Sequence, residues 1–242
     1  FRASMDDPNA DLRIQGNADL NGEYPSVNME AGIRRLDLNK LNLYADSISL
    51  AGNFSVNLSS SNPDNPLGTL SGTDVVLENR GEKIPLGNVR LDMTNEGAEK
   101  NLKLESPFAN ATMKGTYDYT AIGKILTAEI DRYIQLSDTL VPVPDKPYSI
   151  ELAGYLTGHD ALKAFVPALT GMERVNFSAK LSNTADTTIG LIVNAPKTVY
   201  DSTSITGMLL KVAGDGKNLD YNANVEEVLA GKLKIHNLDP AG

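Results

Sequence analysis

The sequence predicts a mainly β protein with antiparallel strands, and three observations predict it. Apolar and polar residues alternate over most of the chain, as they do in strands with one buried face. Short segments rich in Gly, Asn, Asp and Pro, for example 79–83 and 214–218, separate the alternating stretches, and such turns join antiparallel neighbours. Apolar residues at helical spacing occur in only two places.

About fourteen strands follow from the alternation. In chain order we expect them at 11–22, 48–58, 68–79, 84–93, 101–106, 108–119, 148–158, 175–182, 188–195, 205–214, 219–225 and 229–238, with weaker candidates at 26–33 and 36–43. A short word with Gly after an apolar residue and one further residue recurs seven times, as in LAGNF (50–54) and ITGML (205–209). We expect bulges and bends at these glycines, and the alternative is that they leave room for a guest on the apolar face.

Two amphipathic helices interrupt the strands, at 119–136 and within 158–171. Pro167 lies inside the second and should kink or shorten it. The Pro-rich segment VPVPDKP (141–147) between them is the expected boundary. The prediction is therefore one β segment over 1–140 that ends in a helix, and a second over 147–242 with a short helix near 159–171.

Charge and motif content exclude several function classes. The net charge of −9 and a pI near 4.8 argue against nucleic acid and against docking on anionic lipid surfaces. The absence of Cys excludes disulfides and thiol chemistry. We expect surface or capping roles for His159 and His236, and solvated turns rather than calcium sites at 5–11 and 62–66. The prediction is no catalytic residue, no metal and no cofactor.

Periodicity leaves the architecture open. A membrane barrel is disfavoured because aromatic residues make up 6% and Trp is absent, which leaves no aromatic girdles. A sandwich and an open, curved gutter both need strands with one apolar face and one polar face, so alternation does not distinguish them. A gutter of fourteen strands would extend about 65 Å at ~4.8 Å per strand, and its apolar groove would need a guest or partner.

The stretch NADLRIQGNADLNGEYPSVNMEAGIRRLDLNKLNLYADSISLAGNFSVNL (9–58) resembles a repeat region of the TamB/AsmA-like family of bacterial envelope proteins, in its Bacteroidetes form. Residues 65–119 continue in the same style, and a strand ending in Gly-x-Tyr before a helix at 119–135 also fits. The similarity covers residues 9–195, and the remainder more loosely. We expect the chain, which begins at Phe1, to be a piece of a longer protein.

The resemblance implies a long, open half-pipe, or β-taco, with an apolar concave face. It implies a non-enzymatic protein anchored in the inner membrane outside this fragment, in the periplasm of a Gram-negative bacterium. The implied partners are phospholipid acyl chains in transport or, alternatively, an outer-membrane β-barrel protein whose assembly the chain assists. A surface adhesin with sandwich domains is a third alternative, and the helices could plug the groove.

If the groove exists, its lining should come from the apolar parity of the strands. The predicted lining residues are Leu12, Ile14, Leu50, Phe54, Val56, Leu58, Ile150, Leu152, Phe177, Leu191 and Val193.

Overall fold

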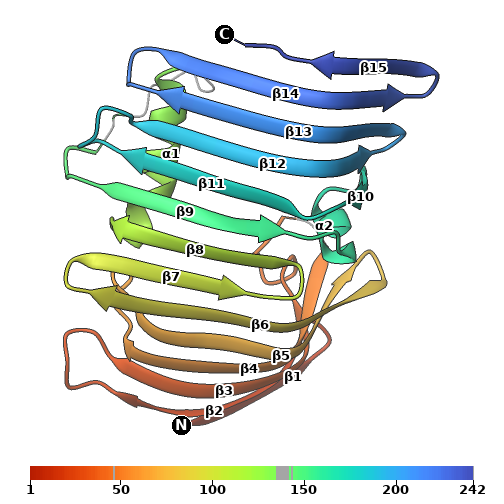
Figure 1. Cartoon of the computed structure of the whole chain (residues 1–242). Helices are drawn as coiled ribbons and strands as arrows, with labels where there is room; N and C mark the ends of the chain where they lie inside the picture. The colour runs from red at the N-terminus through yellow and green to blue at the C-terminus, as the bar shows by residue number, and fades with distance from the viewer. Residues whose placement is uncertain (46, 135–141, 143, 242) are drawn as a thin grey trace. The chain divides into compact units, whose positions relative to one another are not determined.

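The structure is a computed structural model that describes residues 1–45, 47–134, 142 and 144–241, and it is mainly β, as predicted. Fifteen strands form an antiparallel sheet, and among the described residues no pairing joins its first strand to its last (Figure 1). Strand order follows the chain from β1 to β9, continues with β11 and ends at β15, while β10 pairs with β12 beside this path. The chain divides into two compact units, which are described separately.

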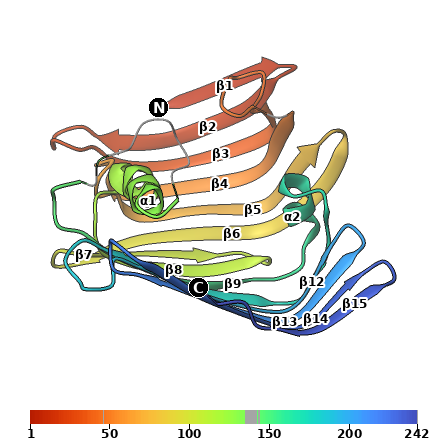
Figure 2. The same ribbon diagram turned by 90° about the horizontal axis from the view of Figure 1, so that it is seen from above.

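Unit 1 comprises residues 1–94, 102–110 and 159–165. Its strands are β1 (Arg2–Asp7), β2 (Ala10–Asp19), β3 (Ser26–Asp37), β4 (Ile48–Ser60), β5 (Leu67–Asn79) and most of β6 (Glu82–Glu96), with parts of β7 (Glu99–Glu105) and β8 (Ala109–Thr116) and the helix α2 (Asp160–Phe165). Strands β1 to β6 lie side by side in chain order (Figure 2).

Unit 2 comprises residues 95–101, 111–158 and 166–242. Its elements are the 3-10 turn η1 (Tyr119–Ala121), α1 (Ile122–Asp131), β9 (Ser149–Leu156), β10 (Leu169–Met172), β11 (Val175–Ser182), β12 (Ile189–Tyr200), β13 (Thr203–Gly214), β14 (Leu219–Ala230) and β15 (Leu233–Leu238). Strands β12 to β14 bend along their length (Figure 2).

Some of the recurring glycines mark bulges and bends, whereas Gly16 and Gly154 lie in regular pairing. Gly52 has φ +145° and lies where the β4–β5 register shifts between Ala51 and Asn53. Gly207, at φ +64°, stands opposite Pro196, since Ala195 pairs with Met208 and Lys197 with Thr206. Pro cannot donate a ladder hydrogen bond and Gly tolerates positive φ, so the two residues share one break in the pairing.

The helices are shorter than predicted. The first comprises η1 and α1, which ends at Asp131, and residues 135–136 of the prediction lie outside the described residues. The second ends at Phe165, and the expectation that it reaches 171 is wrong because Leu169–Met172 forms β10. Pro167 has no amide hydrogen for a helix and disfavours helical backbone at Val166.

One predicted strand is also wrong. Residues 38–45 form turns instead of the strand expected at 36–43, and β3 ends at Asp37. Asp37 Oδ1 accepts the backbone N–H of Lys40 at 3.0 Å, and Asn42 adopts φ +57°. Asp and Asn make such local turn contacts readily, and here they outweigh the alternation. The boundary at 141–147 stays a prediction, and residues 141 and 143 lie outside the described residues.

Each helix packs on apolar residues of its own unit. In unit 1, Ala161 of α2 lies in a buried cluster with Ile48, Leu77 and Ile84. In unit 2 the buried cluster beneath α1 consists of Tyr117, Ile125, Tyr148 and Ile150, and we call it the α1 cluster. Apolar burial on this scale is the main stabilising term for both helices, because neither is long enough to be stable alone.

Candidate functional site

Strand pairing aligns the predicted lining residues of unit 1 into rows. Ile14 pairs with Ala31, which pairs with Phe54 on the next strand. Val56 of the same strand lies between Met29 and Leu70. The remaining lining residues have equally apolar or glycine partners, with Leu12 opposite Ile33, Leu50 between Leu36 and Leu77, and Leu58 between Val27 and Gly68. Across the strands, each of these rows is apolar.

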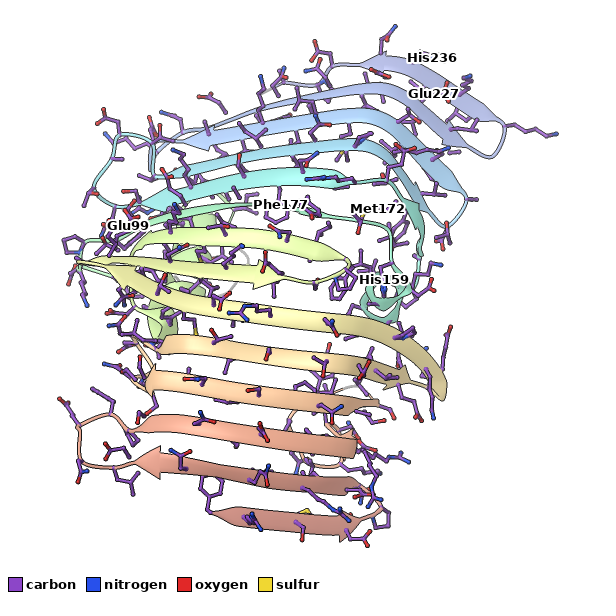
Figure 3. The ribbon with its side chains drawn as sticks, turned by 60° about the horizontal axis from the view of Figure 1, so that its bottom comes forward. Glu99, His159, Met172, Phe177, Glu227 and His236 are labelled. Atoms are coloured by element: carbon purple, nitrogen blue, oxygen red, sulfur yellow. The ribbon has the colours of Figure 1, made fainter. Side chains whose placement is uncertain are left out.

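Unit 2 has the same arrangement. Leu191 pairs with Ala179 on one side and with Val212 on the other. A neighbouring row joins Phe177, Val193 and Leu210. The other predicted members lie on β9, with Leu152 opposite Ala179 and Ile150 opposite Leu181. Phe177, labelled in Figure 3, therefore belongs to a continuous apolar row of three strands or more.

The rows are shielded but mostly not buried. Of the eleven predicted lining residues only Ile150, 4% exposed, is buried, and the other ten are half-buried. Polar residues of the opposite parity, such as Asn53, Ser55 and Asn57, are exposed. Side chains within one row shield one another, which explains half-burial without a second layer over them. Each unit thus keeps apolar surface available away from its helix.

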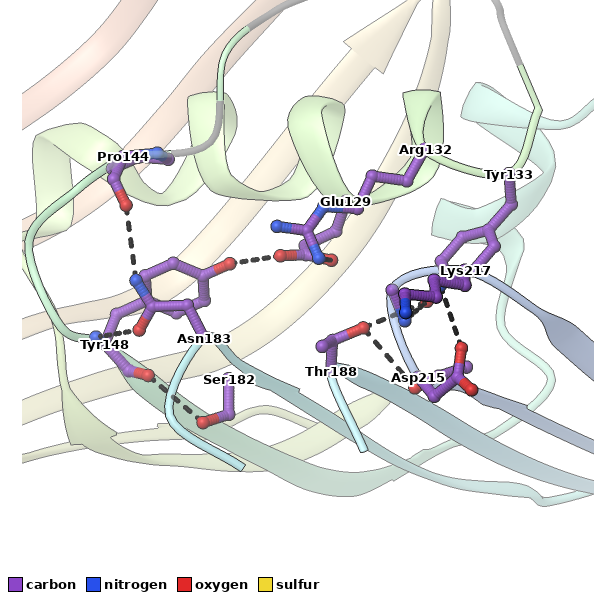
Figure 4. A network of polar contacts seen from close by, with 12 residues as sticks. Glu129, Arg132, Tyr133, Pro144, Tyr148, Ser182, Asn183, Thr188, Asp215 and Lys217 are labelled. Atoms are coloured by element: carbon purple, nitrogen blue, oxygen red, sulfur yellow. Dashed lines mark hydrogen bonds and ion pairs between the residues drawn. The ribbon is translucent and has the colours of Figure 1, made fainter. Parts of the chain in front are cut away.

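A polar network holds α1 over the end of the unit 2 rows (Figure 4). The hydroxyl of Tyr148 donates a hydrogen bond to the carboxylate of Glu129, whose side chain is fully buried. The second Glu129 oxygen lies 3.5 Å from an Arg132 nitrogen. Burial, assisted by Glu129, raises the pKa of Tyr148 above its ordinary value. At neutral pH Tyr148 is therefore a donor, as the buried carboxylate requires.

A second link attaches the residues after α1 to strand ends. The Tyr133 hydroxyl lies 2.9 Å from Thr188 Oγ1, and it accepts the backbone N–H of Gly216 at 2.6 Å. Tyr148 is itself fixed by Asn183, whose Oδ1 accepts its backbone N–H at 2.8 Å (Figure 4). Glu129 lies near the carboxyl-terminal end of α1 and Tyr133 just after it, so these contacts attach that end of the helix to the sheet.

The two histidines have structural surroundings. His159 Nδ1 accepts the backbone N–H of Ala161 at 3.1 Å, a capping contact at the start of α2, and its ring lies 5.3 Å from that of Phe108. His236 is exposed, 3.6 Å from a Glu227 oxygen, at the edge strand β15 (Figure 3). Among the described residues no group of three or more His, Cys, Asp or Glu could hold a metal ion.

Unit 1 carries a hollow that the sequence did not reveal, lined by polar residues and also by Ile14, Ala31 and Phe54 of an apolar row. Its volume is about 890 Å³, and its lining includes Arg2, Arg13, Gln15 and Glu30 from three neighbouring strands. Gln15 donates to Glu30 at 2.9 Å across the β2–β3 pair. Alternation marks these positions only as solvent-facing, so nothing in the sequence distinguishes them from other exposed polar residues.

No protein-family model, curated protein or solved structure matches the chain. In the part of the chain that the structure describes, no helix combines the length and the apolar character needed to cross a membrane.

Proposed function

We propose that the chain is a non-enzymatic lipid-binding module, whose apolar rows shield phospholipid acyl chains during transport between the two membranes of a Gram-negative envelope. In this proposal it belongs with the TamB/AsmA-like proteins it resembles, acts in the periplasm and forms part of an open half-pipe with an apolar concave face. The longer protein would be anchored in the inner membrane.

One observation carries the proposal: half-buried rows of mostly aliphatic side chains continue from strand to strand in both units, and in unit 2 the row of Leu191 and Val212 continues to Tyr221. The pairs Ile14 with Ala31 and Leu191 with Val212 are typical of them. Covering such a row releases water from apolar surface, and an acyl chain gains about 0.8 kcal/mol per CH2 that it buries. Aliphatic contacts do not fix the position of a bound acyl chain along a row, so the chain can bind at many positions.

The test is lipid content after purification from bacterial cells without detergent. The extracted protein is analysed by mass spectrometry for phospholipid, beside Val56→Asp and Leu191→Asp. We expect bound phospholipid in the parent and about tenfold less in each variant, because a carboxylate on an apolar row must be desolvated under a tail.

Matched controls place the same charge on the other face. Asn57→Asp and Ile192→Asp change exposed residues next to the mutated ones in β4 and β12. These controls should retain lipid. A folded parent without phospholipid refutes the proposal, and a scaffold for outer-membrane β-barrel assembly then becomes the better account. The exposed edge strand β1 favours that account, since all six of its residues are exposed and its outer edge is unpaired among the described residues.

A further inference from the structure

The hollow in unit 1 lies on the polar face of its sheet. In β1 to β4 its lining takes three consecutive residues from each strand, namely 2–4, 13–15, 30–32 and 53–55. Successive residues of a strand point to opposite faces, so the first and third residues of each set share a face. Arg13 and Gln15, for example, flank Ile14, whose side chain belongs to an apolar row. The side chains around the hollow are therefore those of the face opposite the apolar rows.

Strand pairing places these side chains in two rows across five strands. One row begins at Arg2 on β1 and ends at Ser71 on β5, and the next begins at Ser4 and ends at Thr73. At ~4.8 Å per strand, each row extends about 19 Å. Every residue of the two rows is polar or charged except Gly32. A surface of this length offers contacts to a chain of polar groups rather than to a single small ion.

Two guanidinium groups in the hollow are unpaired. The side chains of Arg2 and Arg13 make no hydrogen bond and no ion pair with any residue that the structure describes. Arg2 pairs with Gln15, and Arg13 precedes Gln15 by two residues in β2, so the two arginines are diagonal neighbours on one face. Diagonal neighbours are about 7–8 Å apart, which is within reach of long side chains. Both guanidinium groups can therefore contact the same anion.

Nearby carboxylates do not neutralise these two arginines. Glu30 is the carboxylate of the lining, and it accepts a hydrogen bond from Gln15 Nε2 at 2.9 Å. In the adjacent row Asp11 lies 2.7 Å from Arg34, and Asp6 opposite it does not line the hollow. The lining thus contains two positive charges and one negative charge, in a chain whose net charge is −9. An excess of positive charge in a hollow raises the local concentration of anions.

The remaining polar groups of the hollow suit sugar hydroxyls. Ser55, Ser71, Thr73 and Asn53 have side chains without a hydrogen-bond partner among the described residues. Hydroxyl and amide groups both donate and accept hydrogen bonds, as sugar hydroxyls do. Gly32 leaves space beside them, because a Cβ built there would meet only Asn53 Oδ1, at 3.7 Å. A polyhydroxylated ligand therefore finds both room and hydrogen-bonding partners.

We propose that this hollow binds an acidic oligosaccharide, with a carboxylate of the sugar between Arg2 and Arg13 and its hydroxyls on the two polar rows. The planar guanidinium group matches a carboxylate with two parallel hydrogen bonds. A single-stranded nucleic acid fits less well, because its bases stack on aromatic side chains and Phe54, the one ring of the lining, belongs to an apolar row. The inference goes beyond the proposed function and does not depend on it, since the two surfaces lie on opposite faces of the sheet.

Isothermal titration calorimetry at low salt compares four probes. They are a tetramer of galacturonic acid, the same tetramer with every carboxylate methyl-esterified, the galacturonate monomer, and inorganic phosphate. We expect the acidic tetramer to bind about tenfold more tightly than its neutral ester, and to lose most of that preference in high salt. The monomer and phosphate should bind more weakly than the acidic tetramer, because each contacts only part of the hollow.

Arg2→Gln and Arg13→Gln each remove one charge from the hollow, and Arg80→Gln is the matched control. Arg80 is an exposed arginine in the turn between β5 and β6, has no side-chain partner among the described residues and does not line the hollow. Each hollow variant should reduce the tenfold preference by about threefold, and the control should leave it unchanged. All three arginines are exposed, so the variants should fold as the parent does.

A further variant changes the shape of the hollow without changing its charge. Gly32→Val places a side chain in the space beside Asn53 and should weaken binding of both tetramers by about threefold or more, with the preference between them unchanged. Gly32 does not have a positive φ, and Val favours strands, so this variant should remain folded.

The outcomes decide the inference independently of the proposed function. Equal affinity for the acidic tetramer and its ester overturns it, and so does an equal loss of preference in Arg80→Gln, which would show non-specific attraction. If the monomer or inorganic phosphate binds as tightly as the acidic tetramer, the hollow is a simple anion site and the inference is wrong. It is also wrong if no probe binds to a folded parent. The phospholipid content of the same preparation tests the proposed function, so either proposal can fail alone.

Discussion

Loss of the Tyr148 hydroxyl should destabilise unit 2 substantially. Tyr148→Phe removes the donor to Glu129 and leaves the ring, which is 2% exposed, in place. Glu129 is 0% exposed, so water cannot replace the lost donor without opening the site. Arg132, at 3.5 Å, is then the remaining charged neighbour of the carboxylate (Figure 4).

The expected cost in free energy of unfolding is about 2–4 kcal/mol. A hydrogen bond to a charged group contributes about 1.5–3 kcal/mol, and a buried carboxylate left short of a donor adds a desolvation penalty. Glu129→Gln in the Tyr148→Phe background should recover part of that loss, because a neutral amide is cheaper to bury than a carboxylate. Tyr221→Phe, at a residue 45% exposed, should change stability by less than about 0.5 kcal/mol.

Urea unfolding followed by circular dichroism measures these differences as shifts of the transition midpoint at constant slope. The double-mutant cycle formed by Tyr148→Phe, Glu129→Gln and the double variant gives the coupling energy directly. A Tyr148→Phe protein as stable as the parent would refute the reasoning, since the carboxylate would then have no need of this donor. Additive effects of the two substitutions would refute it equally.

Three further predictions concern pH, backbone and core. The pKa of Tyr148 is raised by folding, so its contribution to the free energy of unfolding is complete below the unfolded pKa of about 10 and falls as the pH rises above that value. In urea unfolding at increasing pH, the parent should therefore lose up to about 1.4 kcal/mol of stability per pH unit more than Tyr148→Phe. Gly52→Ala should lower the free energy of unfolding by about 1–3 kcal/mol, because φ is +145° and the new Cβ would lie 3.1 Å from a Cα of β5. Gly123→Ala on α1 should raise it by about 0.5–1 kcal/mol, because nothing lies within 4 Å of the new Cβ and alanine favours a helix. Thermal unfolding of the two variants measures both changes. Ile48→Ala, at a residue 3% exposed beneath α2, should cost about 2–4 kcal/mol by urea unfolding, and an unchanged midpoint would contradict the packing described.

Alternation predicted most strands because one-sided burial repeats every two residues and needs no knowledge of the neighbours. It failed at 36–43, where Asp37 and Asn42 make local turn contacts. Helical spacing failed at 169–172, where it predicts a helix that extends through Leu169 beyond Pro167. There the pairing with β12 decides the conformation, and a partner about thirty residues further along the chain leaves no periodic signal.

Sequence patterns do not predict the buried polar contacts, for a different physical reason. Glu129 has the spacing of an ordinary charged residue on an amphipathic helix, yet it is fully buried against Tyr148. Lys100 likewise resembles any strand lysine until the fold brings it to Asp118. Buried charges occur where a specific partner compensates them, and that partner depends on three-dimensional arrangement alone.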